Sequence, residues 1–252
     1  MPSVFDHPLI SERYFFPRPD APSDLTEVKV EGATLACRLT VRDPDALTLV
    51  FFHGNGEVIA DYVPDFEEML LQLGVNVMFA EYRGYGASTG RPELARMLDD
   101  VTDIVAATGT PPEKLVAFGR SVGSIYAIEL INRFPNAAGL ILESGIADPL
   151  ERVLLRATPE ELGVTASELD AEAERCLNHR AKLERYSGPA LILHAHGDEL
   201  VHRSHAERNH EWLGGEQKRL LIFTRGGHNS VLALNTAEYL DAVADFLEAL
   251  PS

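Results

Sequence analysis

Ser121 is the residue of this chain whose surroundings most clearly suggest chemistry. It follows an apolar run in the segment LVAFGRSVG, residues 115–123, and has Gly119 and Gly123 two positions to either side. A serine on a sharp turn between a strand and a helix needs small residues at these two positions, because larger side chains would clash with the turned backbone. The pattern therefore predicts a strained turn that presents a serine hydroxyl as a nucleophile.

A serine hydroxyl attacks a carbonyl group only when a base accepts its proton, and that base needs an anion beside it. Asp198 follows the apolar segment at 189–196, and His228 lies in the loop after the next apolar segment. The carboxyl ends of parallel strands meet at one edge of a sheet, so we expect Ser121, Asp198 and His228 to come together there.

Attack on a carbonyl carbon produces a negatively charged oxygen, which backbone N–H groups can stabilise. The residue after a nucleophile on this kind of turn usually provides one N–H, and here that residue is Val122. A glycine-rich turn after an earlier strand usually provides the second, and HGNG at residues 53–56 fits this description. We therefore predict the Asn55 N–H as the second donor, and we interpret His53 as a residue that braces the loop.

This chemistry requires no cofactor and no metal ion, and we predict neither. Five histidines within seventeen residues could nevertheless suggest a metal site. Their spacing matches no compact zinc pattern, and no cysteine is nearby. We interpret them as solvated or loop-bracing residues: His194, His196, His202, His205 and His210.

The segments that must position these residues alternate between buried strands and amphipathic helices. Near-continuous apolar runs predict strands at residues 46–53, 75–82, 114–120, 138–144, 189–196 and 218–225. Apolar residues at helical spacing predict helices within residues 62–73, 94–105, 125–131 and 239–247. This alternation is typical of an α/β fold, with a mostly parallel sheet covered on both faces by helices. Residues 28–30 and 34–41 predict an antiparallel hairpin at the sheet edge.

Residues 145–187 interrupt the alternation, because two or three helices are expected there between two strands. This insertion could be a lid, as long connections often are functional, or an enlarged crossover helix. Its apolar residues could line an acyl pocket or anchor the insertion to the core: Val153, Leu154, Leu155 and Leu162. Its acidic residues could attract a cationic substrate, but we interpret them as a solvated face: Glu151, Glu160, Glu161, Glu168, Glu172 and Glu174.

Length and charge set broader limits. The 252 residues are 45% hydrophobic and contain no Ser/Gly/Pro linker, which favours a single domain spanning residues 1–252. A formal net charge of -17 argues against binding to nucleic acid or to anionic membrane surfaces. The sequence shows no leader pattern and no membrane-spanning stretch, and two cysteines, Cys37 and Cys176, are too few for a disulfide framework. We therefore expect a cytoplasmic protein without membrane insertion, and leave its oligomeric state open.

Five motifs resemble those of the serine α/β-hydrolases: FFHGNG, EYRGYGASTG at residues 81–90, GRSVG, LILHAHGDELV and GGHN. They are similar above all to the compact esterase/lipase-like branch, which includes protein depalmitoylases and many uncharacterised bacterial hydrolases. The resemblance extends from about residue 24 to the C-terminus. It implies the α/β-hydrolase fold, acyl-transfer chemistry and the order serine, acid, histidine that Ser121, Asp198 and His228 follow. It also implies that Arg83 braces a structural turn beside the site.

The sequence departs from this family at two places. Ala195 stands at the first glycine position of the family's HGxxD motif, which leaves the turn before Asp198 uncertain. Gly145 follows Glu143 and Ser144, where the family commonly has proline. Some members of the family take the acid from the end of this strand, so the resemblance also makes Glu143 a competing candidate for the acid. Substrate specificity therefore cannot be transferred across the insertion.

Together these features predict a serine hydrolase that cleaves carboxylic esters of a small-molecule acyl substrate through an acyl-enzyme. A serine at the turn argues against dehalogenases and epoxide hydrolases, which use aspartate there. Thioesterase, amidase and aminopeptidase activities run on the same three residues and remain alternatives. A non-catalytic α/β-hydrolase scaffold that binds a ligand or a partner is the alternative from another class.

Overall fold

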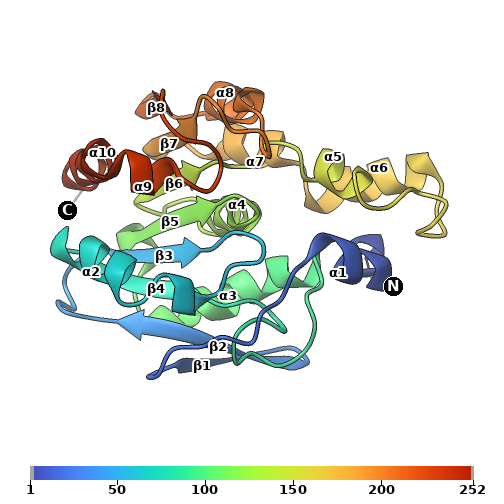
Figure 1. Ribbon diagram of the computed structural model, residues 1–252, viewed down its shortest axis with the longest axis horizontal. Coiled ribbons are helices and arrows are strands. Elements are labelled where there is room, and N and C mark those ends of the chain that lie inside the picture. The colour runs from blue at the N-terminus through green and yellow to red at the C-terminus, as the bar shows by residue number, and fades with distance from the viewer. Residues whose placement is uncertain (1–2, 251–252) are drawn as a thin grey trace.

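Eight strands form one sheet in the order β1-β2-β4-β3-β5-β6-β7-β8 (Figure 1). The computed structural model describes residues 3–250. The strands are β1 (Thr26–Val30), β2 (Ala33–Thr40), β3 (Thr48–Phe52), β4 (Asn76–Ala80), β5 (Leu115–Arg120), β6 (Gly139–Glu143), β7 (Ala190–Ala195) and β8 (Lys218–Phe223). β1 and β2 pair antiparallel, as do β2 and β4, and the other neighbours pair parallel.

The sequence prediction of a mostly parallel sheet with an edge hairpin is confirmed. Every residue of β3, β4, β5, β6 and β7 is buried. Strands covered on both faces lose contact with water on both sides, which explains why they read as continuous apolar runs. The six segments predicted as buried strands extend at most two residues beyond the observed ends.

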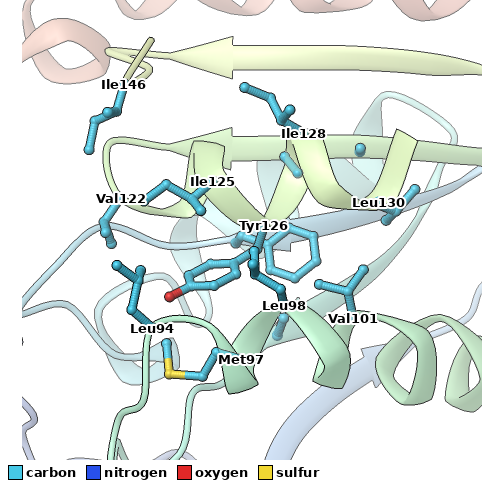
Figure 2. Packing of buried hydrophobic residues seen from close by; sticks show 14 of the residues in the cluster. Leu94, Met97, Leu98, Val101, Val122, Ile125, Tyr126, Ile128, Leu130 and Ile146 are labelled. Carbon is cyan, nitrogen blue, oxygen red and sulfur yellow. The ribbon is translucent and has the colours of Figure 1, made fainter. Parts of the chain in front are cut away.

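Helices cover both faces of the sheet. One face carries α3 (Arg96–Thr108), α4 (Gly123–Arg133), α7 (His179–Arg185) and α8 (Arg203–Trp212). The other carries α2 (Asp65–Gln72) and α10 (Thr236–Glu248), with the short helix α9 (Val231–Leu234) before it. Figure 2 shows Tyr126 of α4 packed among Met97 and Leu98 of α3, with Val122 and Ile146 at one end of the same cluster. This packing fixes the start of α4, and with it Ser121.

The insertion at residues 145–187 contains three helices with different surroundings. The last of them, α7, packs against α4 and α8 and so helps to cover the sheet. The first two, α5 (Pro149–Leu154) and α6 (Ala166–Cys176), lie beside α1 (Pro8–Tyr14) at one end of the molecule (Figure 1). An ion pair between Arg13 Nη1 and Glu161 Oε1, 2.9 Å apart, joins α1 to the insertion. The structure thus has both a crossover helix and an additional helical segment in this range.

Shorter helical turns complete the fold: η1 (Val4–Asp6), η2 (Ile59–Asp61) and η3 (Pro112–Lys114). Within residues 3–250, no helix is long and apolar enough to cross a membrane.

Candidate active site

Ser121 occupies a tight turn between β5 and α4, as the spacing of its glycines predicts. Its φ is +52°, a left-handed conformation that residues with a Cβ rarely adopt. A Cβ at Gly123 would lie 2.0 Å from the Phe52 carbonyl oxygen, and one at Gly119 would lie 2.5 Å from the Ser124 Cα. The Ser121 N–H donates to the Glu143 carbonyl at 2.9 Å, and the Ser124 hydroxyl donates to the Ser121 carbonyl at 2.6 Å. These contacts over-determine the strained residue and hold its side chain in place.

The side chains of Ser121, His228 and Asp198 form a continuous hydrogen-bonded chain. His228 Nε2 is 2.9 Å from Ser121 Oγ, and His228 Nδ1 is 2.8 Å from Asp198 Oδ2. All three residues are buried. Because an ionised carboxylate only accepts, His228 Nδ1 donates to Asp198, which leaves Nε2 free to accept the serine proton. The arrangement can therefore move a proton from the serine to the histidine.

Asp198 is held in its ionised form. Its Oδ1 accepts from the N–H groups of Leu200 at 2.9 Å and Val201 at 2.8 Å. Burial raises the pKa of Asp198, but the hydrogen bond and charge of His228, with the Val201 N–H, outweigh burial and lower the pKa overall. Although Ala195 replaces the family's glycine, the Asp198 N–H still closes a turn onto the Ala195 carbonyl at 3.2 Å. The substitution leaves the carboxylate within reach of His228.

The two predicted donors for a negatively charged oxygen line the same cavity as Ser121. This cavity measures about 190 Å³, and both Asn55 and Val122 contribute to its wall. Among residues 3–250, the backbone N–H groups of Asn55 and Val122 have no hydrogen-bond acceptor. The Asn55 side chain is anchored to the N-terminal segment and to Tyr85, because its Oδ1 accepts from the Phe16 N–H and the Tyr85 hydroxyl while its Nδ2 donates to the Tyr14 carbonyl. These hydrogen bonds hold the loop that carries the Asn55 N–H.

Glu143 lies in a different network from His228. Arg120 Nε donates to Glu143 Oε1 at 3.1 Å, and the Tyr239 hydroxyl donates to Glu143 Oε2 at 2.6 Å. The same guanidinium donates to Glu57 and to the His228 carbonyl, the latter at 3.0 Å. Glu57 in turn accepts from the Gly54 N–H at 2.6 Å. Arg120 thus connects the serine turn, the loop at 53–56 and the histidine loop.

His53 and Arg83 have structural contacts. His53 is buried, with Nε2 2.7 Å from Glu81 Oε1 and Nδ1 2.8 Å from the Gly54 carbonyl. Burial lowers the pKa of His53, but the Glu81 carboxylate outweighs burial and raises the pKa overall. Arg83 makes two hydrogen bonds of 2.6 Å to Asp100 and is buried. Both residues brace loops rather than face the cavity.

The five clustered histidines differ in burial and in contacts, and His210, on α8, is partly buried. His194 is buried in β7 and contacts the Val201 carbonyl, whereas His205 is buried in α8 and accepts from the Ala147 N–H at 3.1 Å. The side chains of His196 and His202 are exposed. Within the described part of the chain, no group of three or more His, Cys, Asp or Glu residues could hold a metal ion.

Several residues of the cavity wall could not be assigned from the sequence. Tyr14 and Phe16 come from the N-terminal segment, and Arg152 and Arg156 come from the insertion. The Arg156 guanidinium lies over the Phe16 ring, 5.9 Å from its centroid. Histidine followed by proline at residues 7–8 was a usable signal for the start of α1, since proline favours the first helical position. No sequence pattern placed these four side chains at the cavity.

Comparison with known proteins identifies the relatives of this chain. A model of the family described as serine aminopeptidase, S33, matches residues 43–169, half of the chain. The chain is 27% identical to the alpha/beta hydrolase domain-containing protein aho-3 of Caenorhabditis elegans over 219 residues, covering 85% of this chain and 61% of the relative. It is 25% identical to the human alpha/beta hydrolase domain-containing protein 17B over 225 residues, covering 86% of this chain and 72% of the relative. The match thus leaves more than a quarter of each relative's length unmatched.

Among solved structures, the chain is similar to an esterase of Pyrococcus furiosus. The TM-score is 0.74 at 19% sequence identity, and the match covers 94% of this chain and 99% of the esterase. At this identity the similarity establishes the fold alone. The predicted α/β-hydrolase fold is confirmed by this match together with the sheet topology.

Proposed function

The chain belongs to the serine aminopeptidase S33 family of α/β-hydrolases, and from this premise we propose that it is a serine hydrolase that cleaves carboxylic esters. In this proposal Ser121 is the nucleophile, His228 the general base and acid, and Asp198 the carboxylate that orients His228. The observation that carries the proposal is the hydrogen-bonded chain from Ser121 through His228 to Asp198, at 2.9 and 2.8 Å.

The reaction proceeds in two halves. Ser121 Oγ bonds to the ester carbonyl carbon while its proton passes to His228 Nε2, and the alcohol leaves with that proton. Water then attacks the acyl-enzyme, gives a proton to His228, and releases the acid and the serine hydroxyl. The backbone N–H groups of Asn55 and Val122 bind the carbonyl oxygen when it becomes negatively charged. No cofactor takes part in either half.

Asp198, not Glu143, is the acid of this proposal, because Glu143 hydrogen bonds to Arg120 and Tyr239 instead of His228. We expect Asp198→Asn to lower kcat by up to about 10⁴-fold, since asparagine favours the wrong tautomer of the histidine. The conservative change Glu143→Gln tests the competing residue and should lower kcat far less. Steady-state kinetics on one ester compare the two variants, and the opposite ranking would transfer the acid role to Glu143.

The wall of the cavity favours an ester over a peptide with a free amino terminus. An aminopeptidase must bind a protonated amine, which carboxylates stabilise best. The wall of this cavity instead contains the cationic side chains of Arg120, Arg152 and Arg156, and none of the residues that line it is acidic. Thioesters present the same carbonyl to Ser121 and are the alternative acyl substrates.

An activity-based probe tests the proposal directly. A fluorophosphonate should label the wild-type protein and the control variant Ser204→Ala, whose serine lies on α8, but not Ser121→Ala. Initial rates on 4-nitrophenyl esters of increasing acyl length, acyl thioesters and aminoacyl anilides then rank the substrate classes. An unlabelled wild-type protein that hydrolyses none of these compounds would favour a non-catalytic scaffold.

A further inference from the structure

Two cationic side chains line the cavity of Ser121 without a partner of opposite charge. Arg152 lies on α5, and Arg156 follows the end of that helix. Among residues 3–250, no carboxylate lies within 4.0 Å of either guanidinium, and the other arginines without an ion pair are Arg185 and Arg225. Two of the four unpaired arginines therefore occupy this one site.

The lack of a carboxylate partner for Arg152 and Arg156 is unexpected in so acidic a protein. The chain has 39 acidic and 22 basic side chains, so carboxylates are abundant. Two acidic residues of the insertion are engaged elsewhere, since Glu151 pairs with Arg208 at 3.2 Å and Glu161 pairs with Arg13 at 2.9 Å. Free cations in an acidic protein leave a local positive potential, which attracts anionic ligands.

The remaining wall of the cavity does not offset this charge. Arg120 also lines it, but Glu57 and Glu143 neutralise that guanidinium from the other side. The other residues at the wall are uncharged or aromatic, apart from His228. Arg152 is partly buried, which limits competition from water and salt at that side chain. Arg156 is exposed, and its guanidinium lies over the Phe16 ring.

On the basis of the proposed hydrolase activity, we infer that the ester substrate carries a carboxylate. Arg152 and Arg156 bind this carboxylate while Ser121 attacks the ester carbonyl. A guanidinium presents paired N–H donors that match the two oxygens of a carboxylate, and it stays charged at every physiological pH. The arginines therefore select among substrates by charge and take no part in the chemical step.

Matched pairs of esters test this inference on both sides of the scissile bond. For the acyl side, the anionic mono-4-nitrophenyl glutarate is compared with the neutral 4-nitrophenyl pentanoate. For the alcohol side, 4-acetoxybenzoate is compared with 4-acetoxybenzamide. The wild-type protein is compared with the double variant Arg152→Gln/Arg156→Gln and with Arg185→Gln, a control at an exposed, unpaired arginine on α7.

In the double variant, kcat/KM for the anionic ester of at least one pair should fall about 10- to 100-fold, as expected for the loss of hydrogen bonds to a charged group. Its neutral partner should change by less than about threefold, and Arg185→Gln should change neither ester. Added salt should weaken the wild-type preference for the anionic ester.

Equal effects of the double variant on the anionic and neutral members of both pairs would overturn the inference. The neutral esters and the fluorophosphonate probe separate this failure from that of the proposed function. If the wild-type protein hydrolyses neutral esters and the double variant changes neither anionic ester, the hydrolase proposal stands and the inference of a substrate carboxylate is wrong. If the wild-type protein hydrolyses no ester and is not labelled by the probe, both the hydrolase proposal and the carboxylate inference are wrong.

Discussion

Replacing Arg120 by methionine should destabilise the protein strongly, because the arginine is the cation of a buried network. Its side chain pairs with Glu57 and with Glu143, whose exposed side-chain fractions are 22% and 5%. Breaking a buried ion pair by removing one partner typically costs 3–5 kcal/mol, since the other charge stays buried and uncompensated. Water can reach Glu57 but hardly Glu143, so one carboxylate carries most of this cost. We therefore expect the free energy of unfolding to fall by about 3 kcal/mol.

Urea unfolding at pH 7, followed by the fluorescence of the single tryptophan, Trp212, measures this loss. Arg180→Met is the matched control, because Arg180 is 65% exposed and pairs with Glu184 on the surface of α7. We expect the control to lose about 0.5 kcal/mol or less.

The double variant Arg120→Met/Glu143→Gln identifies the cause of the loss. Glutamine removes the stranded charge and can still accept from the Tyr239 hydroxyl, so the double variant should be more stable than Arg120→Met alone. The reasoning is refuted if Arg120→Met costs less than about 1 kcal/mol. It is also refuted if the double variant Arg120→Met/Glu143→Gln has a lower free energy of unfolding than Arg120→Met alone.

Two further predictions concern the serine turn and acid stability. Gly123→Ala should prevent correct folding of the turn, because the alanine Cβ would lie 2.0 Å from the Phe52 carbonyl oxygen. Thermal unfolding should show a large drop in Tm, and a Tm within a few degrees of wild type would contradict this prediction. Burial, with neighbouring cations, lowers the pKa of His179 to about 3 and that of His205 to about 4. Below pH ~6.5 the unfolded chain binds protons at these two histidines that the folded chain does not bind. The free energy of unfolding should therefore be unaffected by them above that pH. Between that pH and about pH 4, each histidine should lower the free energy of unfolding by about 1.4 kcal/mol per pH unit. Urea unfolding at pH 7, 6 and 5 tests the direction, and constant or increasing stability on acidification would contradict it.

The sheet could be predicted from the sequence because its strands are buried on both faces and therefore carry an uninterrupted apolar signal. The helices against it were predicted where one apolar face repeats clearly, as in α3 and α10. The helix α8 was not predicted, because its histidines and charged residues hide its narrow buried face, which includes His205 and Asn209. Segments whose burial depends on polar contacts give no such periodic signal.

The contacts among Ser121, Asp198 and His228 could be expected from topology, since each residue follows a parallel strand and parallel strands present their ends at one edge. The walls of the cavity had no comparable rule. Arg152 and Arg156 belong to an insertion whose position depends on tertiary contacts such as the ion pair between Arg13 and Glu161. The side chains proposed to select the substrate were therefore harder to find than those proposed to perform the chemistry.

The anchoring of Asn55 by the N-terminal segment has a consequence for how relatives are compared and how shortened versions of the chain are designed. Asn55 bonds to the carbonyl of Tyr14 and the N–H of Phe16, which are main-chain groups that almost any residue supplies. Substitutions in that segment can therefore accumulate without loss of the anchor, so alignment scores undervalue it. A version of the chain trimmed to the family match at residues 43–169 would lack this anchor as well as Asp198 and His228.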